Sequence, residues 1–316
     1  MLTLEVTRLV GFTNSKLISA FFKVFYWPMC RGYGRYIIGN KPAGEFYRKL
    51  CSFQFYLIHR YWPNFSQPRS FNEKLWSRML HDRNPILTLI SDKLLVREFV
   101  LKKIGKEFLI PLLWQGANPD EIPFNKLPAR FVVKTNHGCG YVIIVDDRME
   151  LDKKNIIRQL KKWLGTNFGQ DTYLGIGWAY KNIKPKIMIE AFMDDEGKPP
   201  VDYKFYCFSG RVEFLTVHYD RFGNHKTRSF DRNFEPYDFR YDFAQWEGEC
   251  LRPKNFEKMI CLSEALSEDF DFMRVDLYNI NNSIYFSELT PYPGGVSTKF
   301  LPLNRDYILG EKWQEK

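Results

Sequence analysis

The stretch FMRVDLYNINNSIYFSELTPYPGG, residues 272–295, is the one around which the rest of the chain is organised. Within it, FMRVDLY alternates around Val275 and Leu277, NINNS is a mostly polar cluster, and IYFSEL returns as a second run. Alternation of this kind is typical of strands and asparagine-rich clusters are typical of turns, so the stretch predicts a β-hairpin. The TPYPGG segment predicts a rigid turn that ends the second strand.

The predicted hairpin carries two acids, Asp276 and Glu288. An acid in a half-buried strand is costly unless it is paired or holds a metal. Two carboxylates that face one point suit a hard cation such as Mg²⁺. Arg274 precedes Asp276 by two positions, so both side chains point to the same face of the strand. The alternative is a surface hairpin with ordinary charges.

Length and composition indicate a globular protein. The 316 residues are 45% hydrophobic and 17% aromatic, which allows a large core and two or three subdomains. Six cysteines are scattered without a CxxC pair. This argues against a zinc cluster and against a secreted disulfide framework, and it fits a reducing cytoplasm.

The net charge of +9 favours anionic partners, and residues 1–48 contribute +5 of it. Nucleic acid is the weakest of these partners, because no zinc-finger or RNA-binding signature is present. Residues 17–29 are apolar and aromatic but short, and Lys23 interrupts them, so we expect neither a membrane span nor a signal peptide. This segment could lie flat on an anionic membrane or pack on the domain body.

Helix signals dominate the first third of the chain. The capping box Ser70-Phe-Asn-Glu73 predicts the start of a helix, and the segment 82–85 predicts its end. A longer helix is expected over 86–104, ended by Gly105, with solvated charges.

A flap follows a loop-rich segment at 111–128. Residues 130–134 predict a strand that ends on Lys134. Residues 135–140, TNHGCG, predict a glycine loop, and residues 141–145 predict a returning strand. The backbone N–H groups of such a loop can hold phosphate oxygens. It is not the Walker loop, which needs GxxxxGK[ST] before a helix.

The remaining elements alternate between helices and strands. In order, we expect a helix at 151–164, a strand at 186–192, a hairpin at 201–208 and 211–217, a long loop at 219–250 and a helix at 255–266. This order predicts an α+β fold with several antiparallel sheets flanked by helices.

Five segments together resemble the ATP-grasp superfamily, and more closely its TupA-like branch, named for teichuronopeptide biosynthesis. They are FNEKLWSRMLHDRNP, SDKLLVREFVLKKIG, LPARFVVKTNHGCG, DYKFYCFSGRV, and RVDLY followed by YFSELTPYPGG. The resemblance covers about residues 70–300. It implies ATP held between two subdomains, with an extension at 1–48 and subdomains at 49–128, 129–200 and 201–316.

The resemblance implies a set of nucleotide-binding residues. Arg97 and Lys134 would reach the phosphates, and the glycine loop would cover them. The loop residues in this role are Thr135, His137, Gly138 and Gly140. The adenine hinge would be Glu190, Ala191, Phe192 and Met193, and Asp202 would bind the ribose.

The resemblance also implies the reacting centre. Asp276 and Glu288 would hold Mg²⁺, and Thr290 stands where the superfamily usually has an asparagine ligand. Lys204 would lie near the γ-phosphate, and Arg274 would stabilise charge in the transition state.

The function implied is that of a cytoplasmic carboxylate–amine ligase that uses ATP and Mg²⁺ and forms an acyl-phosphate. The branch suggests joining an amino acid or another amine to a uronic acid on a surface polysaccharide or its precursor. The acceptor would be an anionic glycan or a nucleotide- or lipid-linked sugar, with peripheral membrane contact through residues 1–48.

Three alternatives stay open. A metal-dependent glycosyltransferase of polysaccharide synthesis would need a D-x-D element, which we do not expect here. An ATP-dependent phosphotransferase would use the same site with a hydroxyl acceptor. A nucleotide-binding scaffold without activity is disfavoured, because Lys134, Asp276 and Glu288 are all present.

Overall fold

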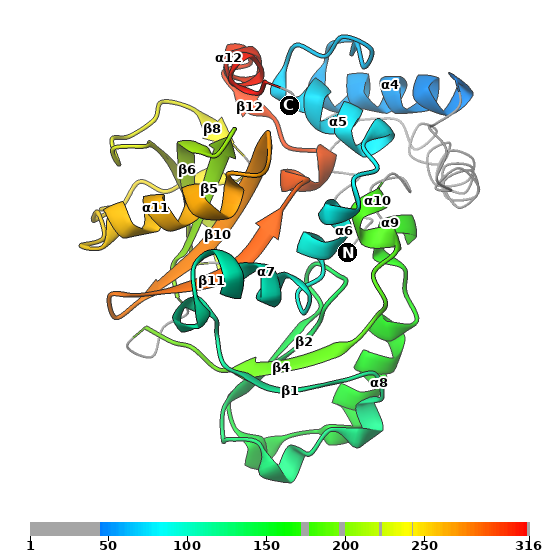
Figure 1. The fold of residues 1–316 in the computed structure, drawn as a ribbon, viewed down its shortest axis with the longest axis vertical. Helices are drawn as coiled ribbons and strands as arrows, with labels where there is room; N and C mark the ends of the chain where they lie inside the picture. Colours follow the sequence, from blue (N-terminus) through cyan, green and yellow to red (C-terminus); the bar gives the residue numbers. More distant parts are fainter. Residues whose placement is uncertain (1–44, 172–176, 196–199, 221–222, 242, 315–316) are drawn as a thin grey trace.

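The computed structural model describes residues 45–171, 177–195, 200–220, 223–241 and 243–314, which form the α+β arrangement of two main sheets and flanking helices in Figure 1. The strands are β1 (Leu112–Gly116), β2 (Phe131–Thr135), β3 (Val142–Val145), β4 (Ile187–Ala191), β5 (Asp202–Phe208), β6 (Arg211–Tyr219), β7 (Lys226–Asp231), β8 (Arg240–Tyr241), β9 (Ala244–Gln245), β10 (Phe272–Ile280), β11 (Ser283–Thr290) and β12 (Phe300–Leu301). The α-helices are α4 (Glu45–His59), α5 (Phe71–His81), α6 (Pro85–Ser91), α7 (Val96–Lys103), α8 (Lys153–Leu164), α9 (Phe168–Asp171), α10 (Trp178–Lys181), α11 (Phe256–Ser267) and α12 (Asn304–Lys312).

The predicted hairpin is confirmed as β10 and β11. Its turn is built on Asn281 and Asn282, whose φ angles of 49° and 60° match the left-handed conformation of a type I′ turn. The hairpin is one edge of a six-stranded sheet of order β11-β10-β5-β6-β7-β9. One face of this sheet packs its apolar side chains, such as Val275 and Phe205, into the large core, on the side where Figure 1 shows α11.

The second sheet is antiparallel, with the order β1-β4-β2-β3, and lies at the lower end of the molecule in Figure 1 beside α8. It has its own apolar core, which includes Phe131, Val133 and Ile189 from the sheet and Ile156 and Leu160 from α8. The predicted strands and the predicted basic helix of this part of the chain are confirmed. Because β1 pairs with β4, this sheet takes a strand from before residue 129.

The helix start at Ser70 is confirmed as a capping box, in which Ser70 Oγ accepts from the Glu73 N–H and the Glu73 carboxylate accepts from the Ser70 N–H. The single helix predicted over 86–104 is wrong. The chain breaks after α6, because Asp92 Oδ1 accepts from the N–H groups of Leu94 and Leu95 and starts α7 instead. Gly105, with φ of 108°, ends α7 as predicted.

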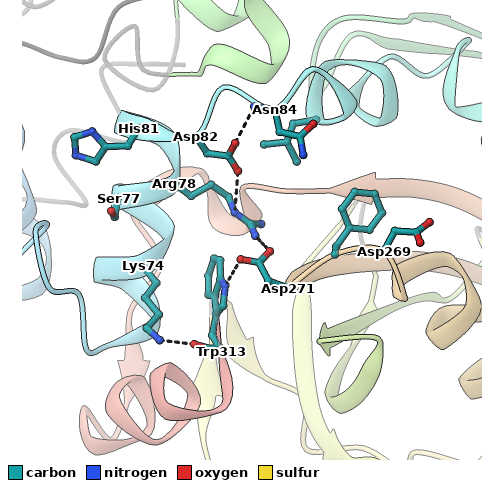
Figure 2. Close-up of a pocket in the computed structure, with 11 residues that line it drawn as sticks. Lys74, Ser77, Arg78, His81, Asp82, Asn84, Asp269, Asp271 and Trp313 are labelled. Atoms are coloured by element: carbon teal, nitrogen blue, oxygen red, sulfur yellow. Dashed lines mark hydrogen bonds and ion pairs between the residues drawn. The ribbon is translucent and has the colours of Figure 1, made fainter. Parts of the chain in front are cut away.

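A buried cation ties α5 to the large sheet. Figure 2 shows the Arg78 guanidinium between Asp271 and the Trp313 indole, with its charge 4.5 Å from the indole centroid. Asp271 also accepts from Trp313 Nε1 at 2.9 Å, so the residue after α12 is fixed to the start of β10. Truncating one partner of a buried ion pair costs about 3–5 kcal/mol, so this contact fixes the N-terminal helices against the sheet.

Two predicted loops contain strands. Residues 111–128 include β1, and residues 219–250 include β7, β8 and β9. The predicted extension at 1–48 lies largely outside the described residues, and its last residues, 45–48, belong to α4, which continues to His59. None of the helices that the structure describes has the length and apolar character needed to cross a bilayer.

Candidate functional site

A cavity of about 520 Å³ is lined by residues of both sheets. Val132, Ile144 and Met188 contribute one apolar wall from the four-stranded sheet, and Tyr278 and Phe286 contribute side chains from the hairpin. Ligand sites of this kind combine apolar walls with a few convergent polar groups. A flat heterocycle would be sandwiched between these two walls.

Charged residues of three neighbouring strands form a row that reaches the cavity at Glu288, and we call it the carboxylate row: Lys204, Asp276 and Glu288. Asp276 on β10 lies directly opposite Glu288 on β11 and opposite Lys204 on β5. Register partners share one face of a sheet, so the pairing itself brings the three groups together. The structure thus places both predicted acids and the predicted lysine side by side.

Asp276 is held by two cations. Its Oδ1 accepts from Arg274 Nε at 2.7 Å, and its Oδ2 accepts from Lys204 Nζ at 2.6 Å. Burial alone would raise the pKa of Asp276, but the charges of Arg274 and Lys204 lower it. Burial alone would likewise lower the pKa of Arg274, and the Asp276 carboxylate raises it well above the usual value. Both side chains therefore stay charged.

Asp202 contacts Lys204 in this structure, and its predicted ribose role remains a prediction. Asp202 is buried, and its Oδ2 accepts from Lys204 Nζ at 2.7 Å. It lies opposite Tyr278 on β10. In the described structure its carboxylate therefore orients Lys204, and it is not among the residues that line the cavity.

Lys93 is a site residue that sequence reasoning missed. Its ammonium lies 3.2 Å from Glu288 Oε1 and donates to the carbonyl of Gly138 at 2.9 Å, so it bridges the carboxylate row and the glycine loop. Burial alone would raise the pKa of Glu288, but the Lys93 charge lowers it. The sequence feature that could have indicated Lys93 is its position after Asp92, because a helix that breaks at Asp92 leaves Lys93 facing the cavity.

Arg97 and Lys134 share one carboxylate. Glu190 accepts from Arg97 at 3.0 Å through Oε1 and from Lys134 at 2.8 Å through Oε2. All three residues line the cavity. A phosphate group that entered here would find two cations already gathered, and Arg97 is further fixed by its bond to the Ile110 carbonyl.

The glycine loop presents only part of its predicted residues to the cavity. Gly138, Cys139 and Gly140 line it. Gly138 has to be glycine in this conformation, because a Cβ would lie 2.2 Å from the Tyr141 ring. Gly140 has φ of 74°, which favours glycine.

Thr135 and His137, by contrast, are buried and do not line the cavity. His137 Nε2 lies 3.2 Å from the Trp163 carbonyl, and burial lowers the pKa of this imidazole. In this structure His137 therefore packs the flap against α8. Its predicted phosphate contact, and that of Thr135, remain predictions.

The predicted adenine hinge follows β4. Ala191, Phe192 and Met193 line the cavity, as the hinge prediction requires. The Arg130 guanidinium stacks 3.8 Å from the Phe192 ring centroid, which fixes that side chain.

Of the two predicted metal ligands, Glu288 is open to the cavity, whereas both carboxylate oxygens of Asp276 accept from Arg274 or Lys204. Glu288 has a side chain that is 27% exposed, lines the cavity and keeps lone pairs beyond its contact with Lys93. Thr290 Oγ1 accepts from Arg274 at 3.0 Å. Within the described ranges, no cluster of three or more His, Cys, Asp or Glu side chains could hold a metal ion. A cation here would therefore depend on two carboxylates and on oxygens from a phosphate ligand.

A D-x-D element does occur, as Asp269-Phe270-Asp271, so the expectation that none is present is wrong. It lines a separate pocket of about 380 Å³, shown in Figure 2. Asp271 is engaged by Arg78 and Trp313, and Asp269 accepts from Lys103 at 2.7 Å. These contacts hold α5, α7 and the C-terminal segment together, which is a structural use of both acids.

Several solved enzyme structures are similar to part of this chain. They include D-alanine–D-alanine ligase from Bacillus anthracis, with 18% identity over 66% of this chain and 60% of that one and a TM-score of 0.40. L-amino acid ligase from Bacillus licheniformis has 15% identity over 71% of this chain and 49% of that one, with a TM-score of 0.44. The chain therefore spans less than two thirds of the length of these two enzymes.

The comparison with curated proteins gave no match. A family model described as TupA-like ATPgrasp matches residues 73–314, which include both sheets, the glycine loop and the carboxylate row. The chain belongs to the TupA-like ATP-grasp family.

Proposed function

We propose that this protein is an ATP-dependent carboxylate–amine ligase. ATP and Mg²⁺ are the cofactors of its family. The observation that carries the proposal is that the carboxylate row and the glycine loop meet at Lys93, which lines the cavity. Lys93 joins the carboxylate row to the glycine loop, and Arg274 and Lys204 flank Asp276 on the same row.

The base, the phosphates and Mg²⁺ would be bound by different residues of the chain. The apolar walls and the Ala191–Met193 hinge would hold the base, while Lys93, Arg97 and Lys134 would hold the phosphates. Glu288 and Asp276 would hold Mg²⁺, which neutralises phosphate charge when bound. Arg274 would stabilise the oxyanion of a tetrahedral intermediate, because it is fixed by Asp276 before the substrate arrives.

In the proposed reaction, a substrate carboxylate is phosphorylated at the expense of ATP, and an amine then replaces the phosphate to form an amide. Family membership supports a uronic acid of a surface polysaccharide or its precursor as the carboxylate and an amino acid as the amine. The basic and aromatic residues within 1–48 support a lipid-linked acceptor at the inner face of the membrane.

The test is an incubation with Mg-ATP, a uronic acid acceptor and a mixture of amino acids, with ADP, free phosphate and product mass read together. ADP with phosphate, and a product heavier by one amino acid less water, is the expected result. ADP with a phosphorylated acceptor and no free phosphate would replace the ligase proposal with a phosphotransferase. Absence of ATP binding would overturn the assignment of the cavity.

A further inference from the structure

Polar side chains continue beyond the carboxylate row on the same face of the large sheet. Thr216 on β6 lies directly opposite Lys204, and His218 follows two residues later. Both are buried, with exposed fractions of 1% and 5%. The residues that alternate with them, Leu215 and Val217, point into the apolar core on the other face. Buried polar groups are costly without partners, so this strip requires a reason other than packing.

Thr216, His218 and His225 form a chain of hydrogen-bonding groups, which we call the histidine relay. Thr216 Oγ1 lies 3.1 Å from His218 Nε2, and His218 Nδ1 lies 2.9 Å from His225 Nε2. A neutral imidazole donates through one nitrogen and accepts through the other, so the three groups can all point the same way. His225 is the half-buried end of the relay, and its ring packs 3.8 Å from that of Phe243.

The relay begins on the strand next to Lys204, the residue that we expect near the γ-phosphate. Adjacent strands lie about 5 Å apart, so the Thr216 position is one strand from Lys204 and two strands from Asp276. Lys204 is only 7% exposed, and its ammonium is held by Asp202 and Asp276. A proton released beside this buried lysine has no direct contact with bulk water, whereas the relay leads from the strand position opposite Lys204 to a more exposed imidazole.

We propose that the histidine relay removes the proton from the attacking amine in the second half of the proposed ligase reaction, on which this inference rests. The amine nitrogen bonds to the acyl carbon, the bond between this carbon and the phosphate oxygen breaks, and phosphate leaves with the electron pair. The nitrogen proton passes to Thr216 Oγ1 as this hydroxyl gives its own proton to His218 Nε2. His218 then gives its Nδ1 proton to His225.

An assay with two different nucleophiles distinguishes a proton-transfer role of the relay from a structural role. Hydroxylamine is largely uncharged at neutral pH and traps acyl-phosphates without a base, whereas the amine of an amino acid is mostly protonated. Wild type, His218→Gln and Thr216→Val are incubated with Mg-ATP and glucuronate, and with either hydroxylamine or an amino acid mixture. Hydroxamate and amide are measured separately. Ser229→Ala is the matched control, because Ser229 lies opposite Thr216 on β7 and outside the relay.

The expected result is near-normal hydroxamate in both relay variants with amide formation reduced by about 100-fold. Ser229→Ala should keep both products. Equal losses with the two nucleophiles, or no loss in either variant, would overturn the relay while leaving the ligase proposal intact. Absence of hydroxamate from wild type would overturn the proposed function and the relay with it, so the two failures are distinguishable.

Discussion

The ammonium of Lys93 lies 3.2 Å from the carboxylate of Glu288, across the gap between the helical segment and the hairpin. This contact places a cation where the phosphates would meet the carboxylate row. We expect Lys93→Met to weaken MgATP binding by about 10- to 100-fold, since a hydrogen bond to a charged group contributes about 1.5–3 kcal/mol. Isothermal titration with MgADP measures the effect.

Lys102→Met is the control for this substitution, because Lys102 is an exposed lysine on α7 that does not line the cavity. It should leave nucleotide affinity unchanged. Nucleotide affinity equal to wild type in the Lys93 variant would contradict a phosphate role for this lysine.

Substitutions of the two acids of the carboxylate row should differ in how much stability the protein loses. Both Glu288→Gln and Asp276→Asn should abolish turnover. Asp276→Asn leaves two buried cations without their shared partner and should lose about 3–5 kcal/mol of stability, whereas Glu288 is partly exposed and its variant should lose less. Thermal melts and ADP release measure the two effects. Full turnover in either variant would refute the metal assignment.

Cys139 offers a chemical probe of the glycine loop. It is exposed and lines the cavity, whereas Cys261 is exposed on α11, away from it. We expect MgATP to protect Cys139 from iodoacetamide and to leave the labelling of Cys261 unchanged, as measured by peptide mass spectrometry. Burial raises the pKa of the Cys207 thiol to about 12, so Cys207 should stay unlabelled in the folded protein. Equal labelling of Cys139 with and without MgATP would remove the loop from the nucleotide site.

The contact between Lys93 and Glu288 predicts a pH dependence. The pKa of Glu288 is lowered from its ordinary value of 4.5, so its contribution to stability is fully present above that value. It is lost as the pH falls through the lower value of the folded state. The difference in melting temperature between wild type and Glu288→Gln should therefore be constant from neutral pH down to about 4.5 and should shrink below it. A difference that changes between neutral pH and this value would contradict the lowered pKa.

Local chemistry made the hairpin and the first helix predictable. The alternation around Val275 and the asparagines of the turn are sufficient to define β10 and β11, and the capping box at Ser70 marks α5. The register that starts at the turn would place Asp276 opposite Ser287. An irregularity between Asp276 and Leu277 shifts the partner to Glu288, so the turn alone does not predict this pairing.

The elements that escaped prediction depend on distant partners. β1 is an edge strand whose burial alternates only weakly, and it is defined by its pairing with β4. The break between α6 and α7 depends on Asp92, which accepts from Asn136 of the glycine loop at 2.9 Å. The sequence therefore predicts Lys93 as one of the solvated charges of a helix at 86–104, whereas its contacts with Gly138 and Glu288 depend on this break.

Asn136 joins three segments at one buried point. Its side chain donates to Asp92 and to the Lys184 carbonyl, and it accepts from the Lys186 N–H, while its carbonyl accepts from the Lys93 N–H. Hydrogen bonds through Asn136 therefore connect the glycine loop directly to the break between α6 and α7. In hydrogen–deuterium exchange, the backbone amides of Lys93 and Lys186 should be protected before any nucleotide is added. Because this region is already ordered, it should contribute little to the entropic cost of nucleotide binding.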